Sequence, residues 1–333
     1  MVKLPEKCFI VADEEGYSNK FAKDIYKKLD ERTPGVFSFN KIETVTHRNK
    51  ERLLHIEKNV RGSHCFYIAE SNQDPQYWLT ELAFVSHTLK NSQAEEIICV
   101  LPNLFFSRQD RKDRARVPIA AKVVADMVGL YADRILTVDV HSQQIQGFYD
   151  IPFDSLPSFR TVAEYLQENH PKIIEDKNLA IASPDAGGGK RAESFAGRLR
   201  NPNIAIGYKI RIKNGDVEEI RFPKEQVEGK NILLIDDIID SGGTLVEAYE
   251  ELKKKGAQKI YAYCTHAFFT EGYDILKKFD RMFIGDTVKQ PYVSRAKIPS
   301  KLERKLDVIP FAPLFAEAIY RTCIGESLSA LFK

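Results

Sequence analysis

The 333-residue sequence lacks several features that mark specialised classes of protein. No apolar run approaches the ~20 residues that a membrane-spanning helix needs, and the first residues lack the apolar stretch of a secretory signal. Lys and Arg number 49 and Asp and Glu number 47, so the basic excess of a general nucleic-acid binder is missing. Five cysteines without CxxC spacing favour buried, reduced thiols over disulfides or a zinc module. We therefore expect a cytoplasmic globular protein with no membrane or nucleic-acid partner.

Short apolar runs alternate with segments of helical period along most of the chain. The runs 97–101, 135–138, 232–235 and 260–264 have the length of buried strands. Continuous apolar strands are typical of parallel sheets that helices cover on both faces. The sequence therefore predicts an α/β fold with mainly parallel sheets flanked by helices.

A candidate domain boundary lies at residues 151–158, where two prolines fall within eight residues. The alternation of strand and helix patterns resumes after this segment. We therefore expect two α/β domains of similar size, residues 1–155 and 156–333.

The strongest functional signal is the segment 231–244, NILLIDDIIDSGGT, in which a buried strand leads through acidic residues into a glycine turn and a helix. Glycines let backbone N–H groups approach an anion, and a helix N-terminus adds positive partial charge. Ser241 and Thr244 can bind the same phosphate, while Asp236 and Asp237 can hold sugar hydroxyls or hydrated Mg2+. A plain capped turn is the alternative, but three acids and two glycines in nine residues favour a phosphate site.

A second glycine-rich loop spans residues 183–191, SPDAGGGKR, again between an apolar strand and a helix. Its three glycines, followed by Lys190 and Arg191, suit a phosphate or diphosphate, and Asp185 is a candidate metal contact. A glycine-rich surface turn is the alternative. Two such loops in one half of the chain favour binding of a phosphorylated substrate.

Two further segments follow strand patterns in the first half. Arg108 to Arg116 contains five basic residues and two aspartates, which suits either a loop for nucleotide phosphates or a solvated charged loop. His141 follows the apolar run 135–138, at a place where a structural histidine is more common than a catalytic one.

Together these segments resemble those of ribose-phosphate pyrophosphokinases, also called phosphoribosyl pyrophosphate synthetases. The resemblance is carried by residues 107–113, 138–152, 183–191, 236–244, 265–266 and 325–332. It implies two related type I phosphoribosyltransferase-like domains, the first for ATP and the second for ribose phosphate. It also implies that the last helix, about 311–333, packs back on the first domain, that Mg2+ is required, and that the chain forms a dimer-based homo-oligomer such as a hexamer.

The implied reaction transfers the diphosphoryl group of ATP to the anomeric hydroxyl of ribose 5-phosphate, giving phosphoribosyl pyrophosphate and AMP. The implied ATP contacts are Phe39, Glu43, Arg108, Gln109, Asp110 and His141. The implied ribose-phosphate site is Asp236, Asp237, Asp240, Ser241, Gly242, Gly243 and Thr244. The implied diphosphate loop is Asp185, Ala186, Gly187, Gly188, Gly189 and Lys190. The resemblance makes His141 and Asp185 ligands of Mg2+, and Lys209 and Arg211 the catalytic pair.

The sequence departs from the family pattern in places that keep other functions open. Lys41 stands where Asn or Asp is usual in the family, and the segment 44–60 is longer and more basic than the family pattern leads us to expect. The ribose-phosphate loop reads Ser-Gly-Gly-Thr in place of the more usual Thr-Ala-Gly-Thr or Thr-Cys-Gly-Thr. The stretches that match a regulatory phosphate or ADP site contain Arg61, Arg116, Ser327 and Ser329, with Asn59 where a serine is common. The alternatives are diphosphorylation of another ribosyl acceptor such as ADP-ribose, a phosphoribosyltransferase, and a non-catalytic regulatory homologue.

Overall fold

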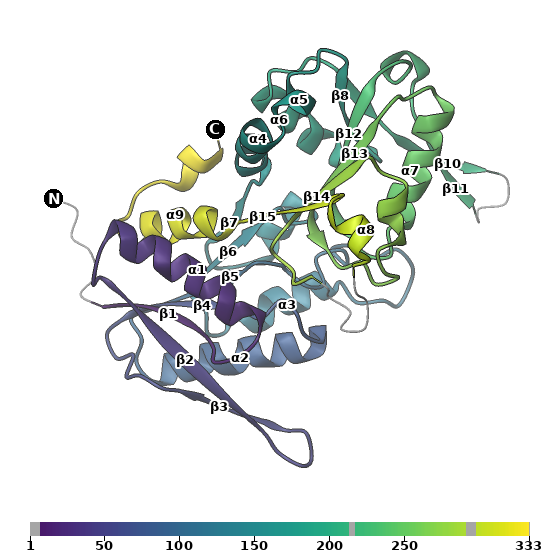
Figure 1. Ribbon diagram of the computed structural model, residues 1–333. Helices are drawn as coiled ribbons and strands as arrows, with labels where there is room; N and C mark the ends of the chain where they lie inside the picture. The colour runs from purple at the N-terminus through teal and green to yellow at the C-terminus, as the bar shows by residue number, and fades with distance from the viewer. Residues whose placement is uncertain (1–6, 213–216, 291–297, 333) are drawn as a thin grey trace. The chain divides into compact units, whose positions relative to one another are not determined.

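The computed structural model describes residues 7–212, 217–290 and 298–332, and for residues 211, 212, 217 and 218 it describes the backbone alone. Its chain divides into two compact units (Figure 1). Unit 1 comprises Met1–Pro157 with Phe311–Lys333, and unit 2 comprises Ser158–Pro310. Within the described residues, no helix has both the length and the apolar character needed to cross a membrane.

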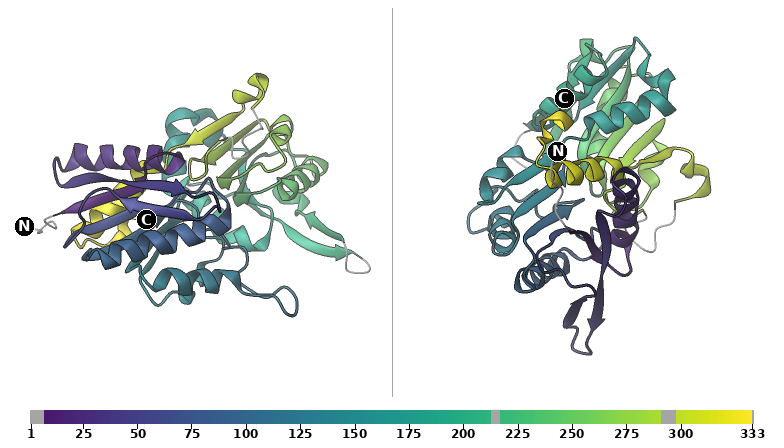
Figure 2. Two further views of the ribbon diagram at one scale, coloured as in Figure 1. Left: turned by 90° about the horizontal axis from the view of Figure 1, so that it is seen from below. Right: turned by 90° about the vertical axis from the view of Figure 1, so that its left-hand side faces the viewer.

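Unit 1 is built on a seven-stranded sheet of order β3-β2-β1-β4-β5-β6-β7. Its strands are β1 (Cys8–Asp13), β2 (Phe37–Thr46), β3 (Arg52–Ile56), β4 (His64–Ile68), β5 (Glu96–Leu101), β6 (Arg134–Val138) and β7 (Phe153–Leu156). Its helices are α1 (Tyr17–Arg32), α2 (Pro75–Asn91), α3 (Ala120–Gly129) and α9 (Ala312–Cys323), with short 3-10 turns η1 (Gln143–Phe148) and η5 (Leu328–Phe332). Helices α1 and α9 pack together on one face of the sheet, and α2 and α3 pack together on the other (Figure 2).

Unit 2 is built on a six-stranded parallel sheet of order β15-β14-β13-β12-β8-β9. Its strands are β8 (Leu179–Ser183), β9 (Ile204–Ile206), β12 (Asn231–Ile239), β13 (Ile260–Ala267), β14 (Arg281–Gly285) and β15 (Leu306–Ile309). A separate antiparallel ribbon consists of β10 (Tyr208–Ile212) and β11 (Val217–Arg221). The helices are α4 (Phe159–Asn169), α5 (Pro171–Ile174), α6 (Gly189–Arg198), α7 (Gly243–Lys254) and α8 (Ser300–Glu303), with 3-10 turns η2 (Ala186–Gly188), η3 (Lys224–Gln226) and η4 (Asp274–Lys277).

The buried strand β13 shows how helices cover both faces of the unit 2 sheet. Phe195 of α6 packs against Tyr263 on one face, with ring centroids 5.3 Å apart. Leu245 of α7 lies in a buried cluster with Ala262 and Cys264 on the other face. Because successive side chains of a strand point to opposite faces, a strand covered on both sides must be apolar throughout. This confirms the prediction of parallel sheets flanked by helices.

The two units share one topology. The strand order is β2-β1-β4-β5-β6-β7 in unit 1 and β9-β8-β12-β13-β14-β15 in unit 2. In each order the first parallel strand of the unit (β1 or β8) lies between the second (β2 or β9) and the third (β4 or β12), and the remaining strands follow in sequence. Along the sequence, each unit has an antiparallel insertion at the same place. It is β3, paired with β2, between β2 and β4 in unit 1, and the ribbon β10–β11 between β9 and β12 in unit 2.

An Asp-Arg dipeptide has the same contacts in both units. Asp133 accepts a hydrogen bond from Ile97 N at 2.9 Å, and the next residue, Arg134, contacts Asp154 at 2.6 Å. In unit 2, Asp280 accepts from Ile260 N at 2.9 Å, and Arg281 contacts Asp307 at 2.6 Å. Identical contacts on topologically equivalent strands show that the units are related, although little residue identity signals it.

All five cysteines are free and buried, as the sequence predicts. Cys8 of β1 and Cys323 at the end of α9 bring the two ends of unit 1 together, with their Sγ atoms 3.7 Å apart. Burial raises the pKa of Cys99 to about 12 and of Cys65 to about 11, so these thiols stay protonated at neutral pH.

Candidate active site

The acids of the predicted ribose-phosphate site lie within β12. The sequence predicts that the strand stops at Ile235, but it continues to Ile239 because its ladder with β13 persists to the pair Ile239 and Ala267. Asp237 is buried, with only 4% of its surface exposed. Asp240, beyond the strand, is exposed and accepts a hydrogen bond from Thr270 Oγ1 at 2.8 Å.

The turn after β12 requires its glycine. Gly242 has a left-handed backbone, with φ of 93°, and a Cβ at this position would lie 2.6 Å from Ile275 Cδ1. Gly243 begins the 12-residue helix α7; its N-cap residue Gly242 has no side chain, and Ser241 Oγ accepts a long hydrogen bond from Gly243 N at 3.4 Å. Ser241, Gly243 and Thr244 are exposed. The N–H groups and dipole at the start of α7 are therefore available to an anion.

The predicted diphosphate loop leads from β8 through η2 into α6. Asp185 Oδ1 accepts a hydrogen bond from Gly188 N at 3.0 Å, and Ser183 Oγ donates to Asp185 O at 2.9 Å. Ala186 and Gly187 are exposed, as is Lys190, whereas Gly189 is buried at the first position of α6. The loop thus exposes the side chain of Lys190 and the backbone of Ala186 and Gly187. The hydrogen bonds of Asp185 hold the loop in this conformation.

Both loops lie at the same edge of the unit 2 sheet. Strands β8 and β12 are parallel neighbours, so their carboxyl ends meet at this edge. The chain turns from β8 toward β9 on one side and from β12 toward β13 on the other, and ligands bind at such switch points in α/β sheets. Arg191 Nη1 of α6 lies 3.3 Å from Asp237 Oδ1 of β12, so the elements that follow and precede the two loops are in direct contact.

The acid pair of β12 is electrostatically coupled. Burial and the neighbouring Asp237 raise the pKa of the Asp236 carboxyl, while Arg191 acts in the opposite direction. Cys264 Sγ donates to Asp237 O at 3.1 Å, and burial raises the pKa of this thiol well above its usual range. Cys264 therefore supports the strand and is no candidate nucleophile.

The predicted catalytic pair lies on β10. Lys209 Nζ is 3.9 Å from Asp185 Oδ2, with both side chains about two-fifths exposed, at 39% and 41%. Arg211 is two residues further along the same strand. Residues 213–216 of the expected strand-loop lie outside the described residues.

The residues predicted to contact ATP lie in unit 1, in two groups. Arg108, Gln109 and Asp110 follow β5, and His141, which is exposed, follows β6. These neighbouring parallel strands end at one edge of the sheet. The other group, Phe39 and Glu43, lies on β2.

Strands β1 and β4 separate β2 from β5, so about 14 Å of sheet lies between the two groups. Phe39 packs edge-on against Tyr26 at 6.2 Å, and Glu43 Oε2 lies 3.2 Å from His55 Nδ1.

In unit 1, the edge that corresponds to the two loops of unit 2 is closed by a carboxylate. Glu70, which follows β4, is 7% exposed and accepts hydrogen bonds from Ser18 N at 2.9 Å and Asn72 N at 2.7 Å. A Cβ at Gly16, whose φ is 103°, would lie 2.6 Å from Glu70 Oε2. The start of α1, which corresponds by topology to the start of α6, therefore already holds an anion of the protein itself.

We expect Glu70→Ala to lower the free energy of unfolding by about 2 kcal/mol, because two backbone N–H groups and the dipole of α1 lose their partner. Glu70→Gln should cost about half as much, since its carbonyl oxygen can accept one of the bonds. Thermal melts of the full chain check this, with exposed Glu15→Ala as the matched control. A Glu70→Ala melt that matches the control would contradict the structural role.

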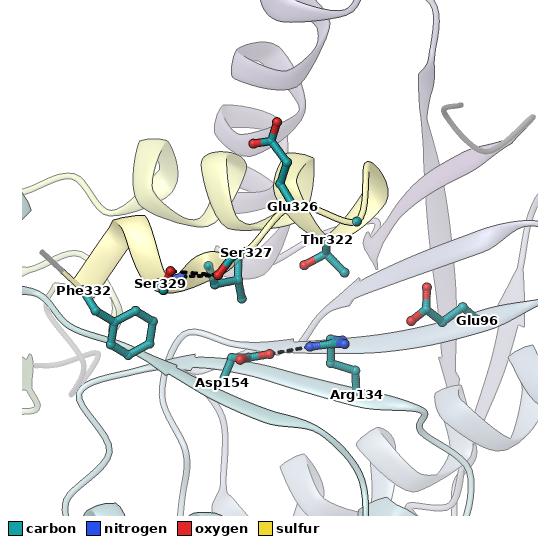
Figure 3. A pocket seen from close by; sticks show the side chains of 10 residues that line it. Glu96, Arg134, Asp154, Thr322, Glu326, Ser327, Ser329 and Phe332 are labelled. Atoms are coloured by element: carbon teal, nitrogen blue, oxygen red, sulfur yellow. Dashed lines mark hydrogen bonds and ion pairs between the residues drawn. The ribbon is translucent and has the colours of Figure 1, made fainter. Parts of the chain in front are cut away.

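A pocket of about 510 Å³ in unit 1 is lined by both serines of the predicted regulatory stretch, Ser327 and Ser329 (Figure 3). Ser327 Oγ donates to Ser329 Oγ at 2.8 Å, and Arg134 and Asp154 pair on the opposite wall. Because Arg281 and Asp307 make the same pair in unit 2, the Arg134 pair is a feature of the fold. Regulation through this pocket stays a prediction.

Within residues 7–212, 217–290 and 298–332, no group of three His, Cys, Asp or Glu side chains is placed to hold a metal ion. Mg2+ is commonly bound by one or two carboxylates together with water and substrate phosphates. Asp185 and the acid pair of β12 supply oxygen ligands beside two phosphate-type loops, so this donor set fits Mg2+ bound together with a phosphorylated substrate.

One contact was missed by sequence reasoning, which assigns Arg191 to a phosphate. The structure directs Arg191 Nη1 to Asp237, 46 positions away in the chain. No local spacing links the two residues, and only the adjacency of β8 and β12 reveals the contact.

Comparison with known proteins covers both units. Residues 14–130 match the N-terminal domain of ribose phosphate pyrophosphokinase, and residues 153–292 match the phosphoribosyl transferase domain. The ribose-phosphate pyrophosphokinase of Thermosipho africanus (strain TCF52B) is 40% identical over 279 residues, 84% of this chain and 85% of that protein. The crystal structure of phosphoribosylpyrophosphate synthetase from Mycobacterium smegmatis is similar with a TM-score of 0.79 and 28% identity, covering 95% of this chain and 98% of that one. The motif-based prediction is thus confirmed, and the chain belongs to the ribose-phosphate pyrophosphokinase family.

Proposed function

We propose that the chain transfers the diphosphoryl group of ATP to the anomeric hydroxyl of ribose 5-phosphate, with phosphoribosyl pyrophosphate and AMP as products. The observation that carries this proposal is the position of two phosphate-type loops at one edge of unit 2, where Arg191 of α6 contacts Asp237 of β12. Membership of the ribose-phosphate pyrophosphokinase family supports the same reaction.

In this proposal the loop 240–244 and the start of α7 bind the 5-phosphate of the acceptor. Asp236 and Asp237 accept hydrogen bonds from its ribose hydroxyls, and the loop 185–190 lies beside the transferred diphosphate. The anomeric hydroxyl oxygen attacks the β-phosphorus of ATP and its proton passes to water. The bond from that phosphorus to the bridging oxygen breaks, and AMP leaves with that oxygen. Lys209 and Arg211 offset the charge that spreads over the transferring group. The reaction needs no protein nucleophile.

Residues 1–155 form the proposed ATP domain and 156–333 the proposed ribose-phosphate domain, whose last segment, about 311–333, packs back on the first and belongs to unit 1. Phe39 and Glu43 contact the adenine, and Arg108 to Asp110 contact the rest of ATP. His141 and Asp185 are the proposed ligands of Mg2+, which when bound supplies positive charge to the phosphate oxygens. The residues of the chain position both substrates around that charge.

The ribosyl acceptor is the part of the proposal that an assay must decide. The 5-phosphate of ADP-ribose is esterified, so a loop at 240–244 that holds a terminal phosphate excludes it. We expect AMP release from ATP and Mg2+ to depend on ribose 5-phosphate, with kcat/KM at least about 100-fold higher than with ADP-ribose. A higher value with ADP-ribose would transfer the proposal to that acceptor, and no AMP release with either would favour a non-catalytic homologue.

We also infer that the chain acts as a homo-oligomer built from dimers, on the strength of its family resemblance. Light scattering during size-exclusion chromatography tests this inference. A mass equal to one 38.0 kDa chain at assay concentrations would contradict it.

A further inference from the structure

Arg191 occupies a position that helix electrostatics disfavours. It is the third residue of α6, in the first turn, where the helix dipole favours anions over cations. Its side chain is only 17% exposed, so water does little to screen the charge. A partly buried cation at a helix N-terminus needs a compensating anion.

Asp237 supplies that anion from a different element. Its side chain is 6% exposed, and its Oδ1 atom lies 3.3 Å from Arg191 Nη1. Arg191 follows the diphosphate loop on α6, and Asp237 precedes the ribose-phosphate loop on β12. The pair therefore fixes the distance between β12 and the start of α6.

We propose that Arg191 is a positioning residue that holds the Asp237 carboxylate in place for the ribose hydroxyls of the acceptor. It thereby makes acceptor binding depend on the geometry of the diphosphate loop. Arg191 acts through Asp237 and does not serve as a phosphate ligand. This inference rests on the proposed function and adds a residue to its acceptor site.

Among the charged and titratable groups that face Asp237, three lie on different elements. They are Asp236 on its own strand, Arg191 on α6 and Cys264 on β13. Arg191 is the cation among these groups, so its loss leaves the buried Asp237 carboxylate without this partner.

The test uses the full-length enzyme with Arg191→Met, Arg191→Lys and a control, Arg198→Met. Arg198 lies on the same helix and pairs with Glu164 at 2.8 Å outside the site. We expect Arg191→Met to raise KM for ribose 5-phosphate at least about tenfold and KM for ATP less than about twofold. Arg191→Lys should recover part of the loss, and Arg198→Met should behave like the wild type.

A double-mutant cycle with Asp237→Asn separates positioning from phosphate binding. If Arg191 acts through Asp237, the losses in acceptor affinity are strongly non-additive, and titration calorimetry with ribose 5-phosphate should show this. Additive losses, or an equal rise in both KM values, would overturn the inference. The cycle compares the wild type, Arg191→Met, Asp237→Asn and the double variant. Thermal melts of these four proteins give the coupling free energy between Arg191 and Asp237 even where activity is weak. A wild-type chain that binds ribose 5-phosphate but releases no AMP would refute the proposed function while the cycle still tests Arg191.

Discussion

Lys209→Ala and Arg211→Ala should each lower kcat by about two or more orders of magnitude while leaving KM for ATP and for the acceptor little changed. Lys209 is held near Asp185 at 3.9 Å, a weak and partly exposed contact that a developing phosphoryl charge can replace. Cations that engage the substrate mainly in the transition state raise kcat without tightening ground-state binding. Steady-state kinetics with both substrates varied measures the split.

Lys224→Ala is the matched control for this pair. Lys224 also lies in unit 2, and its side chain is 61% exposed and pairs only weakly with Glu228 at 2.9 Å. Its replacement should leave kcat unchanged. If both β10 variants instead show raised KM values and a nearly intact kcat, Lys209 and Arg211 are binding contacts and have no catalytic role.

Removing Mg2+ should abolish turnover in the wild type and in every variant. The proposed substrates are phosphorylated, and no group of three His, Cys, Asp or Glu side chains within the described residues is placed to hold a metal ion. In the proposed reaction, free ATP would bring negative charge close to Asp185, Asp236 and Asp237, and a bound Mg2+ would offset it. Activity measured with excess chelator, and again after Mg2+ is restored, tests this expectation.

The expected result is less than about one per cent of normal activity in chelator and full recovery with Mg2+. The melting temperature should hardly change, because the metal arrives with the substrate. Robust turnover in chelator would contradict the proposed chemistry.

The features that sequence reasoning predicted are local ones. The apolar run 232–235, the turn at Gly242 and the start of α7 are encoded within one short segment, so the phosphate-type loop was recognisable. The glycine loop at 185–190 was recognisable for the same reason. In both cases the structure adds the steric need, such as Ile275 beside Gly242, that the sequence does not show.

The features that escaped prediction depend on strand adjacency. The length of β12 depends on a ladder with β13, and the contact of Arg191 with Asp237 depends on β8 lying beside β12. The closure of unit 1 by Glu70 likewise joins β4 to the start of α1. Such long-range pairings follow from topology, and no periodicity or spacing along the chain reports them.

The most direct test of the account follows the fate of the β-phosphorus of ATP. The purified chain is incubated with Mg2+, ribose 5-phosphate and ATP labelled at that phosphorus, and the products are separated. Diphosphoryl transfer predicts that the label appears in phosphoribosyl pyrophosphate, with one unlabelled AMP formed for each labelled product. Label found in ADP, or no transfer to the sugar phosphate, would contradict the central claim.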